Sequence, residues 1–394
     1  MMKPFALLGL LIMLSPSAVG AQNSIFGTLG IGFPGRVGGV RSIALGGGSD
    51  IFDRASVLNP ALAASFGRVT VGAVSGTTFR SYTAAGTEAS GLQETRFPLF
   101  FLGGGFGRSS FSYHVSVATF AERTFDLKTV DTVMAGDLPL PVQDRIIADG
   151  GVVDIRAAIG WRRSAKLALG GAVHRFAGSS RFTATRTFDS GGFQPFLERD
   201  VVSFAGTSFS AGLVWLPNAR LGFGFAAGVS SSLTSETVNP TRLMSPNDGL
   251  EAESSSKVAM PVSLAGGVWV AVTPRTRLMT TARWRSWSRA QDGLPGTRTQ
   301  AFDTWEVGSG LEIVSGPGSG GKFPLRLGIR YAQLPFSPSN EQPSEWNFSV
   351  GTGAPFAANR AVIEVALERF QRDGAGARER GWYFTVGFMI TPVQ

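Results

Sequence analysis

The sequence predicts an all-β protein: a transmembrane antiparallel β-barrel of about fourteen strands with an N-terminal hatch inside the lumen. From about Arg68 onward, apolar residues alternate with small or polar ones, which is the period of a strand with two different faces. The 394 residues include 52 Gly and 30 Phe, a composition that disfavours helices and favours strands. After the N-terminus, no window offers the roughly 18 apolar residues that a membrane-spanning helix needs.

Residues 1–21 have the pattern of a secretory signal peptide. An apolar stretch from Phe5 to Leu14 is followed by the small-residue site Val19-Gly20-Ala21. About ten apolar residues are too few to cross roughly 30 Å of hydrocarbon as a helix. We therefore expect export, with the bacterial outer membrane as the destination. The chain has no cysteine, which excludes a disulfide scaffold and a thiolate metal site.

Residues 22–67 differ from the rest of the chain because they are rich in glycine and show no sustained period of two. A segment of this length suits a small plug, or hatch, packed inside the barrel that residues 68–394 are expected to form. A disordered periplasmic tail is the alternative interpretation.

Alternation divides the remainder of the chain into strands with one apolar face and one small or charged face. Between 323 and 331, for example, Phe323, Leu325 and Leu327 share a face, with Arg326 and Arg330 on the other. The predicted strands are 68–80, 95–106, 109–126, 151–162, 166–182, 201–216, 219–234, 256–273, 275–289, 299–314, 322–334, 344–353, 359–371 and 379–391.

The connections between these strands alternate largely between short and long. Tight links such as Gly107-Arg108 and Pro217-Asn218 separate longer stretches, and the glycine-rich link 315–321 is the exception. Long loops on one side and tight turns on the other are typical of outer-membrane barrels, with both barrel ends on the periplasmic side. The long stretches are 81–94, 127–150, 183–200, 235–255, 290–298, 335–343 and 372–378.

Tryptophans fall on the apolar face of several strands, some of them near strand ends. Such positions favour a girdle at the lipid headgroups, although a packed soluble core could also hold indoles. The tryptophans are Trp161, Trp215, Trp305, Trp346 and Trp382.

Two parts of the sequence resemble the FadL/TodX family of outer-membrane hydrophobic-compound transporters. In the N-terminal segment these are the run Ala44-Leu45-Gly46-Gly47-Gly48 and the element Asn59-Pro60-Ala61-Leu62. Near the C-terminus, Leu325–Tyr331 and the closing strand Trp382–Phe388 are also similar to that family.

The resemblance implies a hatch that plugs the lumen, with Gly46, Gly47, Gly48, Asn59, Pro60 and Ala61 as its characteristic residues. It also implies capture of an apolar ligand by outer loops and release, with a sideways exit into the membrane through a kinked third strand as one route. The expected third strand, Ser109 to Asp126, contains no Gly or Pro, so the sequence indicates no kink there.

The predicted function is therefore a channel or transporter for small hydrophobic compounds such as long-chain fatty acids or aromatic hydrocarbons. PorV-like barrels share the hatch signature and act as a scaffold or shuttle for protein secretion, which is the alternative. A transporter should have an apolar cavity under the hatch, whereas a scaffold should have a filled lumen.

Strand parity also places charged residues inside the barrel. One interpretation is mutual pairing that holds the hatch to the wall. The other is that Arg326 or Arg330 binds the carboxylate of an amphipathic ligand, because an arginine fork matches a carboxylate. Asp154, Arg285, Glu306, Glu312 and Glu368 belong to this inward set, and its candidate ligand-binding members are Arg156, Arg283, Arg326, Arg330 and Glu364.

Other sequence patterns do not support an enzyme or a cofactor. Gly30–Gly35 matches G-x-G-x-x-G, but it contains a proline and lacks the strand and helix of a dinucleotide site. His114 and Ser116 share a lumen face without an identifiable acid, and two histidines cannot form a histidine-rich metal centre.

The net charge of +8 is scattered along the strands rather than clustered. It therefore indicates anionic outer-membrane lipids rather than nucleic acid as the partner. Besides the hydrophobic ligand and these lipids, other envelope proteins are the remaining class of partner.

Overall fold

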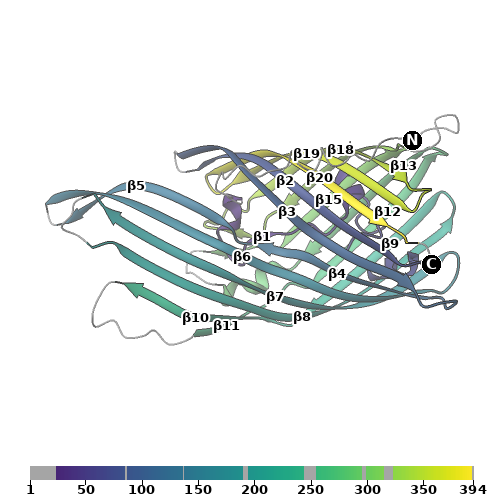
Figure 1. Cartoon of the computed structure of the whole chain (residues 1–394), viewed down its shortest axis with the longest axis horizontal. Helices are drawn as coiled ribbons and strands as arrows, with labels where there is room; N and C mark the ends of the chain where they lie inside the picture. The colour runs from purple at the N-terminus through teal and green to yellow at the C-terminus, as the bar shows by residue number, and fades with distance from the viewer. Residues whose placement is uncertain are drawn as a thin grey trace.

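The computed structural model describes residues 24–84, 87–135, 137–189, 194–243, 254–294, 299–314 and 323–392, and the predicted signal peptide lies outside them. The described chain forms one closed antiparallel β-barrel (Figure 1). The wall has fourteen strands, because β5, β10 and β11 continue β4, β9 and β12. The predicted antiparallel β-barrel and its strand number are confirmed.

The wall strands follow one another around the barrel in chain order. They are β2 (Thr70–Ala84), β3 (Thr87–Gly105), β4 (Phe111–Glu122), β5 (Phe125–Ala135), β6 (Leu138–Arg162), β7 (Leu167–Phe188), β8 (Phe196–Asn218), β9 (Leu221–Ser230), β10 (Leu233–Leu243), β11 (Ser254–Val258), β12 (Ser263–Thr273), β13 (Thr276–Arg285), β15 (Thr304–Ile313), β16 (Leu325–Gln333), β18 (Ser344–Phe356), β19 (Ala361–Gly374) and β20 (Ala377–Ile390).

Pairing of the first wall strand with the last closes the barrel. β2 and β20 are antiparallel from Val71 opposite Ile390 to Ala84 opposite Ala377. A closed sheet leaves no unpaired edge in contact with lipid, which is the condition for β-structure to span a bilayer. In the described residues, no helix is long and apolar enough to cross a membrane.

The outer face of the wall is apolar, as the alternation predicted. Trp215, Trp305, Trp346 and Trp382 are exposed on it, together with many aliphatic and phenylalanine side chains. No other part of the described chain covers these side chains. Lipid is the environment in which such a surface is stable.

Several predicted loops are wrong, because β2 continues to Ala84 and β3 begins at Thr87, and because β5, β6, β7 and β8 continue far past the other strands (Figure 1). Most of 81–94, 127–150 and 183–200 is strand rather than loop. These extensions carry polar pairs such as Arg145 with Asp126 and Arg186 with Asp144, so the apolar alternation that identified the strands is missing there.

Smaller differences concern strand ends on the long-loop side. The predicted strand 275–289 ends at Arg285 and is followed by the 3-10 helix η3 (Trp287–Gly293). A two-stranded sheet of β14 (Gln300–Ala301) and β17 (Phe336–Ser337) lies in the next two connections. The link predicted at 315–321 lies outside the described residues.

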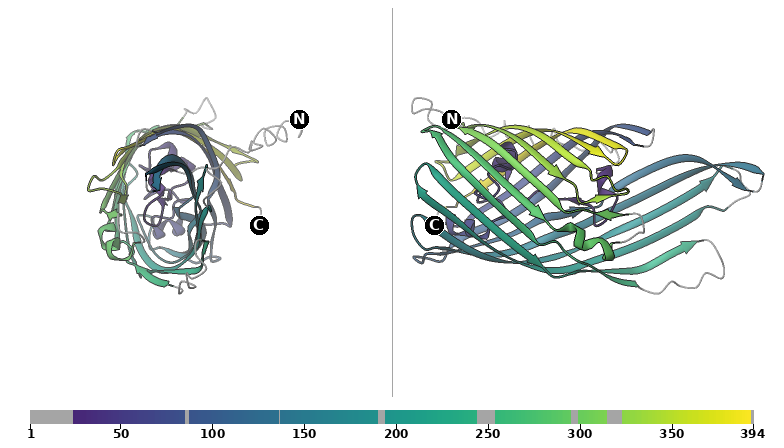
Figure 2. Two further views of the ribbon diagram at one scale, coloured as in Figure 1. Left: turned by 90° about the vertical axis from the view of Figure 1, so that its left-hand side faces the viewer. Right: turned by 180° about the vertical axis from the view of Figure 1, so that it is seen from behind.

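The N-terminal segment occupies the inside of the barrel, as the end-on view in Figure 2 shows. From Ser24 onward it forms the 3-10 helix η1 (Ile25–Gly27), β1 (Phe33–Pro34), the short helix α2 (Val40–Ala44) and the 3-10 helix η2 (Pro60–Ser65). α2 contacts β16, β18, β19 and β20, whereas η2 contacts β4, β6, β7 and β8.

Candidate functional site

The inner face of the wall has glycines where the run Ala44–Gly48 packs against it. Gly46 has φ +60° and Gly47 has φ +78°, a region that favours glycine. A side chain at Gly46 would meet the backbone of Ile329 at 2.5 Å. On the wall, Gly308 and Gly328 face Gly46 equally closely. The predicted glycine run is therefore needed for a tight turn and for backbone-to-backbone packing.

The Asn59-Pro60-Ala61 element packs in the same way on the opposite side of the lumen. The Asn59 side chain caps η2 by accepting a 3.0 Å hydrogen bond from the amide of Ala61, and its Nδ2 donates to the carbonyl of Leu213. Gly212 and Gly170 lie beneath Asn59 and Pro60, where side chains would clash. Asn59 thus joins the segment to β8.

Ion pairs tie the segment to the wall at two further points. Arg36 pairs with Glu368, and Arg41 donates to Glu312 at 2.8 Å. Asp50 belongs to the segment, and burial together with the negative charge of Glu306 on the wall raises its pKa to about 6. The Ser42 hydroxyl, which donates a 2.5 Å hydrogen bond to Asp50 Oδ1, acts in the opposite direction and lowers this pKa.

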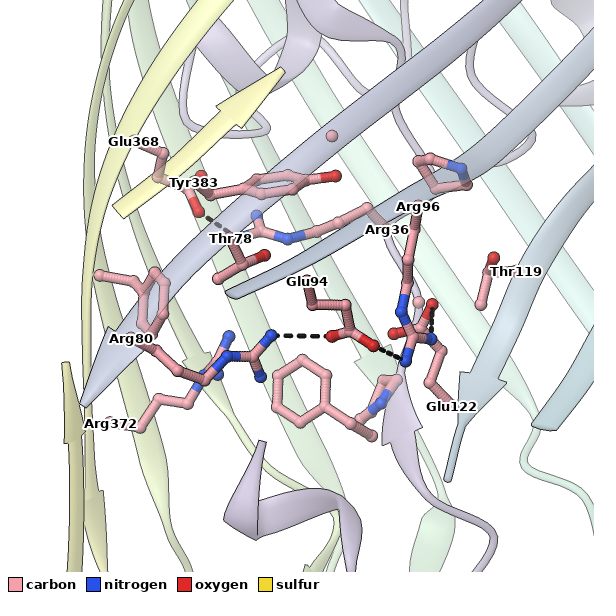
Figure 3. A pocket seen from close by; sticks show the side chains of 16 residues that line it. Arg36, Thr78, Arg80, Glu94, Arg96, Thr119, Glu122, Glu368, Arg372 and Tyr383 are labelled. Carbon is pink, nitrogen blue, oxygen red and sulfur yellow. Dashed lines mark hydrogen bonds and ion pairs between the residues drawn. The ribbon is translucent and has the colours of Figure 1, made fainter. Parts of the chain in front are cut away.

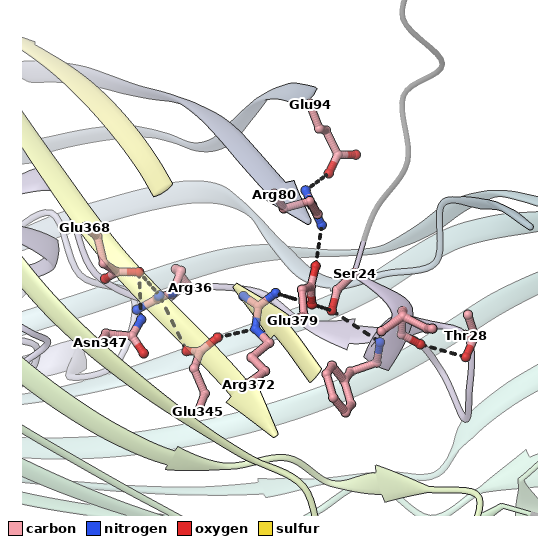
Figure 4. Close-up of polar contacts among 12 residues, drawn as sticks. Ser24, Thr28, Arg36, Arg80, Glu94, Glu345, Asn347, Glu368, Arg372 and Glu379 are labelled. Carbon is pink, nitrogen blue, oxygen red and sulfur yellow. Dashed lines mark hydrogen bonds and ion pairs between the residues drawn. The ribbon is translucent and has the colours of Figure 1, made fainter. Parts of the chain in front are cut away.

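Charged side chains of alternating sign form a continuous belt on the inner wall, which we call the charge belt. Each member pairs with the next across nine consecutive wall strands, from β13 to β4, and Figure 4 shows its central part. The belt runs through Arg283, Glu306, Arg330, Glu345, Arg372, Glu379, Arg80, Glu94, Arg96 and Glu122.

Most of the predicted lumen residues belong to such pairs. Arg283 and Arg330 are members of the belt, and Arg326 pairs with Glu312 at 3.0 Å and with Glu364 at 2.8 Å. The structure thus shows the mutual pairing that was one of the two interpretations of these charges.

Arg156 differs from the other predicted arginines. Its side chain is 1% exposed, and its Nη1 lies 2.9 Å from Nδ1 of His114. Its Nε and Nη2 have no hydrogen-bond partner among the described residues. The ring of Phe66, next to η2, stacks on His114 with 5.3 Å between ring centroids and covers this corner of the lumen.

Breaking the belt should destabilise the barrel strongly. Glu345 pairs with both Arg330 and Arg372, so Glu345→Gln removes one of the two counter-charges of each buried guanidinium group and leaves Glu306 and Glu379 as their remaining partners. We expect a loss of roughly 3–5 kcal/mol in the free energy of unfolding, measured by urea titration in lipid vesicles with tryptophan fluorescence. Asp144→Asn, which breaks an exposed pair, should cost less than about 1 kcal/mol. Equal losses in the two variants would show that the belt adds no stability.

The barrel wall has a seam between β3 and β4. The two strands pair only from Gly105 opposite Ser112 to Leu99 opposite Ala118. Beyond that point β3 pairs with β2 alone, and β5 pairs with β6 alone. Pro98 is the next residue of β3 and has no N–H to continue the ladder. Along this seam, the ion pair of Arg96 with Glu122 links the strands (Figure 3).

The third strand contains no Gly or Pro from which a kink could be predicted, yet the structure interrupts it. The strand is interrupted at Arg123 and Thr124, between β4 and β5. At the break, Arg123 N–H donates a 2.9 Å hydrogen bond to the carbonyl of Gly150 on β6, where φ is +129°. A search for Gly or Pro within the third strand alone could not reveal it.

Two cavities meet at this seam. The seam cavity has an empty volume of about 620 Å³ and is lined by charged groups of the belt, by Tyr383 and by β1 (Figure 3). The lumen cavity has an empty volume of about 850 Å³. Gly35, Arg36 and Thr119 line both cavities. Since β1 pairs with β4 at Ala121 and Glu122, this part of the N-terminal segment separates them.

The lining of the lumen cavity is mainly apolar and comes from the segment and from the wall. Its apolar members are Val37, Val57, Leu58, Ala118, Phe120, Phe176, Ala226, Ala227, Met260, Pro261 and Ala265, and its polar members include Asp154, His174, Ser208, Ser210, Ser263, Arg283 and Arg285. A pocket of this composition binds small apolar molecules, with a few polar groups to orient them.

The sequence did not point to His174, Ser210 or Met260 as residues of the site. His174 lies on β7, Ser210 on β8 and Met260 in the connection between β11 and β12, so no local sequence pattern shows that they line one cavity. The pair singled out earlier, His114 and Ser116, lies outside the lining of that cavity.

The sequence matches no protein-family model and no curated protein sequence. Solved structures do match. A FadL homologue of Pseudomonas aeruginosa has a TM-score of 0.61 at 15% identity, and the match covers 92% of this chain and 99% of that one. The toluene transporter TbuX of Ralstonia pickettii has a TM-score of 0.59 at 13% identity, covering 90% and 98%.

The toluene transporter TodX of P. putida is similar to the same degree, with a TM-score of 0.58 at 14% identity and coverage of 91% and 99%. This chain therefore has the fold of the FadL/TodX outer-membrane channels over nearly its whole length. The resemblance that the N-terminal motif and the closing strands indicated is confirmed for the fold.

Proposed function

We propose that this chain, with the fold of the FadL/TodX channels, conducts small hydrophobic compounds across the outer membrane. The observation that carries the proposal is the lumen cavity, whose lining is mainly apolar and comes from both the N-terminal segment and the barrel wall. A mainly apolar lining with a few polar groups is the kind of site that binds small hydrophobic molecules.

The N-terminal segment acts as the hatch in this proposal. It is fixed by close backbone packing at Gly46 and Asn59 and by the ion pairs of Arg36 and Arg41. β1 is held by a two-residue pairing with β4, by the 2.9 Å hydrogen bond from Gly35 N to the carbonyl of Phe120, and by Arg372 stacked on the Phe33 ring. Displacement of β1 joins the lumen cavity to the seam cavity and gives the ligand a sideways exit.

The rival function, a scaffold for protein secretion, requires a filled lumen. The lumen cavity of about 850 Å³ favours the channel instead. Similar structures named as toluene transporters agree with aromatic hydrocarbons as ligands. Arg285, which lines the lumen cavity and has only a 4.0 Å approach to Glu306 among the ion pairs of the described residues, favours carboxylated compounds such as fatty acids as a second group.

Filling the cavity tests the proposal. Ser263 faces the cavity and is partly exposed to it, so Ser263→Trp places an indole in the ligand volume. Cells producing this variant should take up labelled toluene roughly tenfold more slowly than cells producing the unaltered protein.

The neighbouring residue provides the control. Leu264 is 49% exposed on the outer face of the same strand, so Leu264→Trp adds the same side chain on the lipid side. Its uptake rate should equal that of the unaltered protein. If Ser263→Trp also leaves the uptake of toluene and of a labelled fatty acid unchanged, the lumen cavity is not the path.

A further inference from the structure

Three side chains in the lumen cavity form a connected hydrogen-bond relay. The Nδ1 of His174 lies 2.8 Å from Oδ2 and 3.1 Å from Oδ1 of Asp154. Its Nε2 lies 2.8 Å from the Oγ of Ser210. Because an ionised carboxylate only accepts hydrogen bonds, Nδ1 carries the proton, and Nε2 accepts the hydroxyl proton of Ser210. This is the order of a nucleophile, a general base and an orienting acid.

Three adjacent strands supply the relay. Asp154 is on β6, His174 on β7 and Ser210 on β8, and each pair is offset by two residues in register. Diagonal neighbours on one face of a sheet lie within reach of longer side chains. The wall is rigid at this point, because the backbone of all three residues belongs to a continuous ladder. Asp154 and His174 are buried, whereas Ser210 is partly exposed.

The relay opens onto space that a substrate can occupy. Asp154, His174 and Ser210 all line the lumen cavity, alongside apolar groups such as Phe176 and Met260. A hydroxyl that only needed a hydrogen-bond partner would not require an imidazole held by a carboxylate, since backbone carbonyls satisfy most serines.

The same cavity contains a cation placed opposite the nucleophile. Ser210, Gly228, Ser263 and Arg285 lie in one row across β8, β9, β12 and β13. Gly228 has no side chain, and the hydroxyl of Ser263 fills the space beside it, so Ser263 is the side chain that lies between Ser210 and Arg285. Among the ion pairs of the described residues, Arg285 has only a 4.0 Å approach to Glu306. Its guanidinium is therefore suited to stabilise an oxyanion.

We propose that Ser210, His174 and Asp154 form a hydrolytic site for small hydrophobic carboxylic esters. This inference is independent of transport. In the first step, Ser210 Oγ bonds to the ester carbonyl carbon, and its proton passes to His174 Nε2. Arg285 stabilises the negative carbonyl oxygen. The bond from carbon to the alkoxy oxygen then breaks, and the alcohol leaves with the proton from His174.

Water completes the reaction. It gives a proton to His174 Nε2 while its oxygen bonds to the acyl carbon, and Ser210 leaves and recovers that proton. The net reaction converts an ester and water into a carboxylic acid and an alcohol, with no change of oxidation state. Asp154 orients the imidazole and stabilises its protonated form.

The test uses the full mature protein in detergent with p-nitrophenyl butyrate as the probe. Ser210→Ala should lower the rate of p-nitrophenol release by at least about 100-fold, because it removes the nucleophile. Ser116→Ala is the matched control: another buried serine of the inner wall, outside the cavity lining, whose loss should leave the rate unchanged. The heat-dependent gel migration of barrels verifies that each variant is folded.

A second measurement does not depend on the choice of ester. Diisopropyl fluorophosphate should add to Ser210, which mass spectrometry of the labelled peptide identifies, and His174→Gln should abolish the adduct. Hydrolysis that equals that of Ser210→Ala, together with the absence of an adduct on Ser210, would overturn the proposal. Loss of the adduct without loss of toluene uptake would show that hydrolysis and conduction are separate functions.

Discussion

Locking β1 to the wall should stop conduction almost completely. Pro34 lies opposite Ala121 in the antiparallel pairing of β1 with β4, and such partners are roughly 4.5–5.5 Å apart, within the range of a disulfide. In the double variant Pro34→Cys, Ala121→Cys, the disulfide holds β1 between the two cavities. Toluene uptake by oxidised cells should fall to that of cells lacking the protein, and dithiothreitol should restore it.

The chain has no cysteine of its own, so only the two introduced cysteines can form a disulfide within it. The single variants Pro34→Cys and Ala121→Cys cannot form the bond and should conduct normally under the same oxidant. If the oxidised double variant conducts as fast as the reduced one, β1 does not move during transport, and the sideways exit through the seam is wrong.

The second large effect is expected from Gly46→Val, which should release the hatch. A valine at φ +60° is strained by roughly 1–2 kcal/mol, and its Cβ would also meet the backbone of Ile329 at 2.5 Å. The backbone of Ile329 cannot move away, because β16 is hydrogen-bonded to both of its neighbouring strands. The run Ala44–Gly48 must therefore move off the wall. We expect an open pore with stable conductance in planar bilayers, in which the unaltered protein should be closed.

Gly376→Val separates the two causes of that effect. Gly376 has a similar φ of +73°, but nothing lies within 4 Å of an added Cβ. This variant has the same backbone strain without the clash, and it should stay closed. If both variants form an open pore, the conductance results from general loosening of the barrel and not from loss of the contact between Gly46 and the wall.

Much of the fold could be predicted from the sequence, because every strand that crosses the membrane needs an apolar face toward the lipid. One face must be apolar, so alternation identified all fourteen wall strands, and the outward tryptophans followed from parity. Outside the lipid a strand needs no apolar face. The long extensions of β5 to β8 therefore lack the alternation and were predicted as loops. Asn59 and the glycines at 46–48 were found through a resemblance, which could not say what they touch.

The candidate site was much less accessible. Sequence parity placed Arg330 and Asp154 inside the barrel, but parity does not say which inward residue meets which. His174 was considered only as a metal ligand, and its partners Asp154 and Ser210 are 20 and 36 residues away from it in the chain. A kink was sought from Gly or Pro in the third strand itself, whereas the strand is interrupted at Arg123 and Thr124, opposite Gly150 on the neighbouring strand.

The sequence by itself determined the orientation of side chains, because the period of a strand is local and each residue faces either lipid or lumen. Only the tertiary structure decided the register between strands and the closure of the barrel. Register joins Glu345 to Arg330 and Arg372, and closure brings β20 beside β2 so that the charge belt continues to the seam. These relations depend on the pairing of residues far apart in the chain, which no local pattern encodes.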